Sequence, residues 1–71
     1  DPHHPFLMDE FQRMLSLCCV RLAKMPPLFE THQDGRLVVL LPQDQGQAII
    51  DCALDRLIGQ LERRAYGLRV N

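Results

Sequence analysis

The chain has little of the chemistry on which enzymes depend. Its 71 residues include one serine, Ser16, one threonine, Thr31, and one tyrosine, Tyr66, and they contain no glycine-rich phosphate loop. A catalytic nucleophile needs an orienting neighbour and a pocket. A chain this short can hardly enclose a substrate cavity of roughly several hundred Å³. We therefore expect no enzymatic activity and no small-molecule substrate.

The chain also lacks an excess of basic charge and a long apolar run. Eight Lys and Arg residues stand against nine Asp and Glu, for a net charge of −1. Nucleic-acid-binding proteins usually show a clear basic excess, because phosphate neutralisation supplies much of their affinity. No apolar run approaches the ~20 residues that span a bilayer. These features predict a protein partner, make nucleic acid an unfavoured one, and predict no membrane segment.

Cysteines are few and irregularly spaced. Cys18, Cys19 and Cys52 are odd in number, and two of them are adjacent, unlike the framework of a small secreted protein. We expect buried thiols in an intracellular protein of the cytoplasm or nucleus. The paired ligand spacing of structural zinc sites is absent as well, so we expect no metal and no cofactor.

Residues 1–5 read as a flexible lead-in, and residues 6–71 as one domain, which could be a fragment because the chain begins with Asp1 and not Met. A helix is predicted from Phe6 to about Met25, before the helix-stopping Pro26 and Pro27. Its apolar residues fall in one arc of roughly 140° at 100° per residue. They are Leu7, Met8, Phe11, Met14, Leu15, Cys18, Cys19, Leu22 and Met25.

A β-hairpin is predicted for residues 28–41. Asp34-Gly35 lies between two apolar runs, and a two-residue turn at this point would pair Thr31 with Val38 and Phe29 with Leu40. The return strand is apolar on both of its faces.

A second helix is predicted after Asp44, which could cap it together with Gln47. Gly67 fits the residue just past its end. The predicted apolar stripe again covers about 140°. It contains Ile50, Ala53, Leu54, Leu57, Ile58, Leu61 and Ala65, and Leu68 is a candidate for its last member.

The predicted fold is therefore a small α+β domain of α-β-β-α order. Two helices can cover one face of a hairpin but not readily both, and strands with one wet face usually alternate apolar and polar residues. We expect a protein partner to cover or extend the sheet, either a second copy of the chain, our first choice, or another subunit of a larger complex. The expected contact residues are Val38, Val39, Leu40 and Leu41 on the sheet, with Phe6, Leu17 and Val20 on the first helix.

Nucleic-acid binding through the second helix is the alternative function. Its side chains would come from one helix face, namely Arg56, Gln60, Arg63 and Tyr66 around Gly59. Arg and Gln can reach phosphates and bases, and Tyr can stack on a base. The acidic residues Asp51 and Asp55 on the same helix argue against this function.

Overall fold

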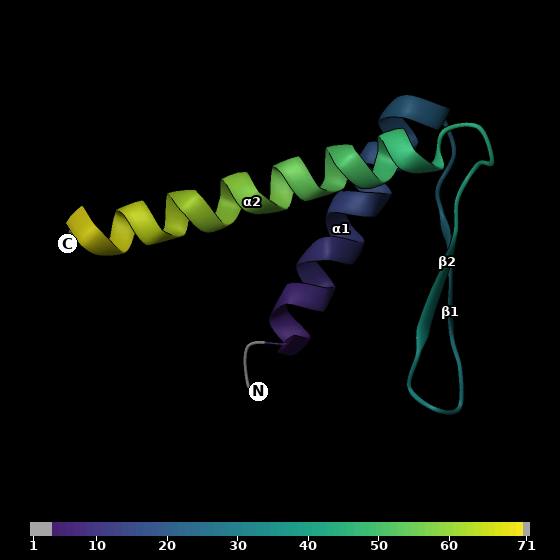
Figure 1. Ribbon diagram of the computed structural model, residues 1–71, viewed down its shortest axis with the longest axis horizontal. Helices are drawn as coiled ribbons and strands as arrows, with labels where there is room; N and C mark the ends of the chain where they lie inside the picture. The colour runs from purple at the N-terminus through teal and green to yellow at the C-terminus, as the bar shows by residue number, and fades with distance from the viewer. Residues whose placement is uncertain (1–3, 71) are drawn as a thin grey trace.

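Two helices and a two-stranded antiparallel sheet follow one another in the predicted α-β-β-α order (Figure 1). The computed structural model describes the backbone of residues 4–70 and the side chains of residues 7–65. The elements are α1 (His4–Ala23), β1 (Leu28–Thr31), β2 (Leu37–Leu40) and α2 (Gly46–Val70). The predicted α+β fold is confirmed.

Helix α1 begins two residues earlier than predicted and also ends two residues earlier. It starts at His4, so the expected lead-in is already helical at its last two residues. It stops after Ala23 because Lys24 adopts a left-handed backbone conformation with φ of 61°. The amide of Lys24 still donates to the carbonyl of Val20 at 3.0 Å, which closes the last turn ahead of Pro26.

The hairpin register differs from the prediction by one residue. Phe29 lies opposite Val39 and not Leu40, and Thr31 lies opposite Leu37 and not Val38. Opposite residues share a face of the sheet, so the slip moves Phe29 to the other face of β2 from the one predicted.

The cause of the slip is a three-residue loop in place of the expected two-residue turn. The amide of Gly35 donates to the carbonyl of His32 at 2.9 Å, and the amide of His32 donates to the carbonyl of Arg36 at 2.8 Å. Gly35 has φ of 86°, the left-handed value that this longer loop requires at its last position. Asp34 also accepts a hydrogen bond from the amide of Arg36 at 3.1 Å.

Helix α2 starts without the predicted capping pair. Asp44 and Gln47 form no hydrogen bond with each other. The side-chain amide of Gln47 donates instead to Asp51 Oδ1 at 2.9 Å. The turn before the helix is held by Gln45, whose amide donates to Pro42 O at 3.1 Å. The helix then continues through Gly67 to Val70, past its predicted end.

A covalent bond joins the two helices. Cys18 of α1 and Cys52 of α2 form a disulfide, with their Cα atoms 6.2 Å apart. The prediction of free thiols is therefore wrong for this pair, whose 34-residue separation carries no spacing signal in the sequence. It is right for Cys19, which is a buried free thiol.

The core is small and lies where the helices cross. Its buried apolar residues come from α1 and the first half of α2, namely Met14, Leu15, Cys18, Cys19, Ile49 and Ala53. The inner face of the hairpin packs against this cluster through Phe29 and Val39, and Leu41 follows from the next segment. Close to the same crossing, the side chain of Gln45 donates to the carbonyl of Leu22 at 3.2 Å.

The predicted stripe of α2 is rotated away from this core. The buried side chains on α2 are Ile49 and Ala53, and the disulfide turns Cys52 toward α1. At 100° per residue this face lies about a quarter turn from the centre of the predicted stripe. Leu54 and Ile58 therefore remain exposed.

The molecule is more extended than a globule of its length. Its radius of gyration is 13.8 Å, whereas about 11 Å is typical of a compact 71-residue domain. The shape is also thin, 42 × 30 × 15 Å, and the C-terminal half of α2 projects beyond α1 (Figure 1). On α2 the apolar side chains of Leu54, Ile58 and Leu61 remain exposed.

Candidate interaction surfaces

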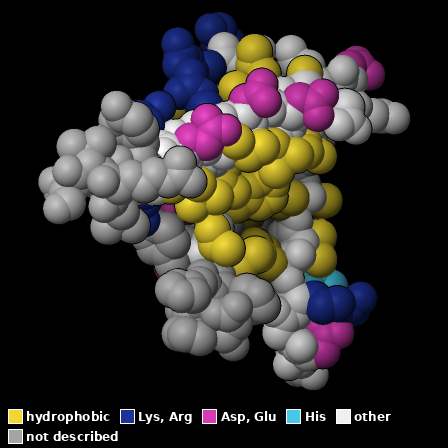
Figure 2. Space-filling model, turned by 60° about the vertical axis from the view of Figure 1, so that its left-hand side comes forward, with side chains coloured by type: hydrophobic (Ala, Val, Ile, Leu, Met, Phe, Trp, Pro, Cys, Tyr) yellow, Lys and Arg dark blue, Asp and Glu magenta, His cyan; other side chains and the backbone are white. Residues whose placement is uncertain are grey.

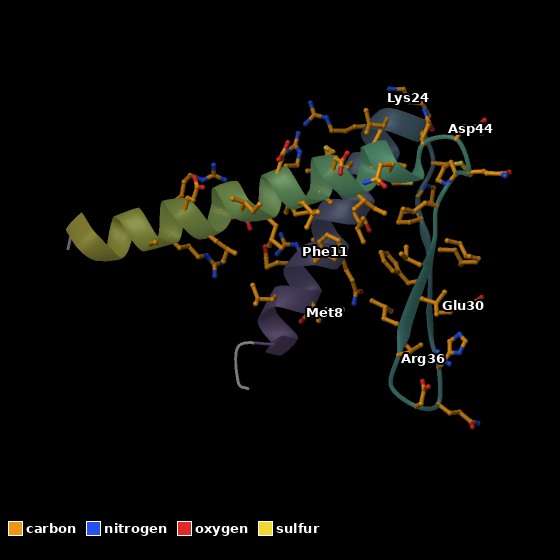
Figure 3. All side chains as sticks on the ribbon, viewed as in Figure 1. Met8, Phe11, Lys24, Glu30, Arg36 and Asp44 are labelled. Carbon is orange, nitrogen blue, oxygen red and sulfur yellow. A yellow bond between two sulfur atoms is a disulfide. The ribbon has the colours of Figure 1, made fainter. Side chains whose placement is uncertain are left out.

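The first candidate surface is the outer face of the hairpin, made of Leu28, Glu30, Val38 and Leu40. Leu28 and Leu40 lie opposite each other across the two strands and are 56% and 53% exposed. Glu30 points away from both helices (Figure 3). Within the described residues the sheet has only its two strands, so each strand has an edge without a β-partner.

The four predicted contact residues of β2 and its end divide between the two faces. Val39 and Leu41 pack against the core, Leu40 is exposed, and Val38 is half-buried on the outer face. The alternation along β2 agrees with the prediction that one apolar face would remain outside the helices. Of these residues, Leu40 is the one most available to a partner.

The predicted residues on α1 lie apart from the core. Leu17 and Val20 are 41% and 49% exposed, and both line an open depression of about 900 Å³ between α1 and β1. Phe29 and Glu10 also line this depression. Glu10 forms an ion pair with Arg13, with 3.1 Å between Oε1 and Nη1. Phe6 lies outside the residues whose side chains are described.

A third surface was not among the predicted contacts. Leu54, Ile58 and Leu61, which we call the α2 stripe, are 42%, 51% and 39% exposed. Sequence reasoning assigned them to the core because their spacing is that of a buried helix face. The missing signal was the Cys18–Cys52 pairing, since a disulfide at Cys52 fixes which side of α2 meets α1.

The residues of the nucleic-acid alternative are partly brought together. Arg56, Gln60 and Arg63 line an open depression of about 640 Å³ where α2 crosses α1, together with Gly59. A Cβ at Gly59 would meet the Arg63 guanidinium at 3.6 Å, an ordinary contact. Asp55 also lines this depression, which lowers its positive charge. The side chain of Tyr66 lies outside the described residues.

Other site types find little support in the described part of the chain. Among the residues described, no three His, Cys, Asp or Glu side chains are grouped in a way that could hold a metal ion. In the same range no helix has the length and hydropathy of a membrane span. A further open depression, of about 770 Å³, lies at the hairpin tip and is lined by polar and charged residues such as His32 and Arg36.

Comparison of the chain with protein-family models, with curated proteins and with solved structures finds no match.

Proposed function

We propose that this protein is an interaction and oligomerisation module, and that its first partner is a second copy of itself. The observation that carries the proposal is the exposed cross-strand pair Leu28 and Leu40 on a sheet of two strands. A two-stranded hairpin is marginal in water, and more strands or a second packed face stabilise it. A symmetric dimer would supply both from the same sequence.

Pairing of strand edges fits this surface better than stacking of two outer faces. Glu30 lies opposite Val38 in the middle of the outer face. Face-to-face stacking would bury its carboxylate, which is costly without a partner charge. Edge pairing would leave Glu30 in solvent and would satisfy backbone groups that are otherwise unpaired.

The small core supports the same proposal. A domain of this length buries only about 60% of the surface of its unfolded chain. Burial of an exposed Leu side chain contributes up to about 1.5–3 kcal/mol. Edge pairing would set the outer-face side chains of the two copies side by side, and even partial burial of Leu28 or Leu40 would add an amount that matters to a small domain.

Light scattering after size exclusion tests the proposal through Leu40→Asp. We expect a concentration-dependent dimer for the wild type and a monomer of unchanged circular dichroism for Leu40→Asp, because edge pairing through β2 would set the aspartate beside the outer-face side chains of the second copy. Leu22→Asp is the matched control, since Leu22 is also exposed but lies on α1, and it should still dimerise. A wild type that is monomeric at every concentration would sink the proposal. Val39 is unsuited to this test because it packs against the core.

We also propose an intracellular location, and this location affects the state of the disulfide. In a reducing cytoplasm or nucleus the Cys18–Cys52 disulfide would be open for much of the time. The helices would then be held by packing and by the Gln45–Leu22 hydrogen bond. Alkylation of freshly lysed cells followed by mass spectrometry would give the oxidised fraction of the pair.

Nucleic-acid binding is kept as the second candidate because Arg56, Gln60 and Arg63 share one depression. A salt titration of single-stranded oligonucleotide binding tests it. Steep weakening with salt would support the candidate, and absence of binding at low salt would remove it.

A further inference from the structure

The α2 stripe is bordered by acidic side chains on one side and by the core on the other. Leu54, Ile58 and Leu61 follow one another at steps of four and three, so they form one straight row on the helix. Toward the core this row continues into Leu57, which is half-buried against the central cluster. The exposed row is thus an open extension of the hydrophobic core.

Three carboxylates run along the other border of the stripe. Asp51, Asp55 and Glu62 are exposed and fall within an arc of about 40°, roughly 70° around the helix from the stripe. Figure 2 shows acidic side chains directly beside a broad hydrophobic area. Within the described residues none of the three forms an ion pair, and Asp51 accepts only the hydrogen bond from Gln47.

We propose that the α2 stripe binds an amphipathic helix of another protein that carries an apolar face flanked by Lys or Arg. The apolar row would pack against the partner's apolar face, as in helix-in-groove recognition. The acidic border would face the partner's basic flank, which fixes the orientation of the helix and rejects an acidic one. The stripe spans about two helical turns, so a partner segment of two to three turns is long enough to cover it.

Charge favours this partner over a second copy of α2. Two α2 stripes packed antiparallel would place the acidic borders of both helices side by side, and like charges at that distance repel. Parallel packing would set each acidic border against Leu57 of the other copy. Antiparallel packing supplies no basic flank to the three carboxylates, and in parallel packing Arg64, one heptad after Leu57, is the one basic side chain of the described residues on that border.

The proposal goes beyond the proposed function, because it names another class of partner at another surface. It rests on the exposure of the α2 stripe and not on the hairpin, so loss of hairpin dimerisation would leave it standing. The two are measured separately, the first by oligomeric state and the second by peptide binding.

Binding of a designed peptide tests the inference. The probe is a fluorescent amphipathic peptide of about three turns with Leu on one face and Lys along its flank, and the counter-probe replaces each Lys by Glu. We expect saturable binding of the basic peptide to the disulfide-bonded protein, with affinity falling between about 0.05 and about 0.5 M salt. The acidic peptide should bind at least about tenfold more weakly, because like charges would face each other.

Variants of both parts of the surface complete the test. Leu61→Asp should weaken the basic peptide more than about tenfold, because a charge would enter the apolar row. The triple change Asp51→Asn, Asp55→Asn and Glu62→Gln should weaken it by about tenfold and flatten its salt dependence. Asp9→Asn is the control, since Asp9 is an exposed carboxylate on α1.

Four outcomes would overturn the inference. The first is no binding of the basic peptide, and the second is equal binding of both peptides. The third is full binding to Leu61→Asp and to the triple variant. The fourth is a loss of oligomer mass in Leu61→Asp like that in Leu40→Asp, which would assign the stripe to contacts between copies. Circular dichroism checks the fold of each variant. The triple variant leaves the apolar row unchanged, so it tests the acidic border alone.

Discussion

At the scale of single residues, Cys52 marks the side of α2 that meets α1. Its bond to Cys18 lies on the same side of α2 as the buried Ile49, whereas Ile58 lies on the opposite side and is exposed. A stripe of apolar residues thus becomes a surface and not a core. Two stability measurements test this difference, one on reduction of the disulfide and one on alanine variants of two isoleucines of α2.

Opening the Cys18–Cys52 bond should destabilise the protein substantially. The bond closes a loop with a sequence separation of 34 residues, and the chain-entropy estimate for such a loop is roughly 3–4 kcal/mol. Urea unfolding with and without a dithiol reductant measures the loss. The double variant Cys18→Ala and Cys52→Ala is the control, because reductant should not change its midpoint. An unchanged wild-type midpoint on reduction would contradict the expectation.

Ile49→Ala and Ile58→Ala should differ strongly although both lie on α2. Ile49 is fully buried, so its truncation leaves a cavity and should cost about 2–5 kcal/mol. Ile58 is 51% exposed, so its truncation should cost no more than about 0.5 kcal/mol in the monomer. Chemical denaturation at low protein concentration compares the two. The opposite order would mean that the sequence-predicted stripe is the true core face.

At the scale of elements, local signals predicted what local physics determines. The proline pair and the Asp34-Gly35 turn placed the ends of α1 and the hairpin to within a few residues, because these signals act through backbone conformation. The prediction of the hairpin register was wrong because a two-residue loop and a three-residue loop are both compatible with Gly35. The prediction of which face of α2 is buried was wrong because that face depends on a contact between residues far apart in the sequence.

Glycine substitutions test the two kinds of element with one chemistry. Gly35→Ala should cost about 1 kcal/mol or more, because Gly35 has φ of 86° and alanine avoids this conformation. Gly59→Ala should instead stabilise by up to about 1 kcal/mol, because Gly59 lies inside α2 and a Cβ there makes only an ordinary contact. Thermal and urea unfolding of both variants give the signs. Equal signs would contradict the assigned backbone conformations.

At the scale of the whole molecule, the described residues leave several large apolar side chains exposed. The chain is long and thin, the core occupies one helix crossing, and apolar rows remain open on the hairpin and on α2. The exposed apolar face of the hairpin was predictable in part, because the continuous apolar character of β2 is visible in the sequence, and binding of a partner there stays a prediction. The α2 surface was not, since its residues carry the pattern of a core.

The dependence of stability on protein concentration is the most direct test of whether folding of this domain is coupled to dimerisation. The measurement is the urea midpoint of the oxidised wild type over a hundredfold range of concentration. Folding coupled to dimerisation adds about 1.4 kcal/mol per tenfold increase, so we predict a midpoint that rises steadily with concentration. A midpoint that stays constant over the whole range would show a self-sufficient monomer and would contradict the account.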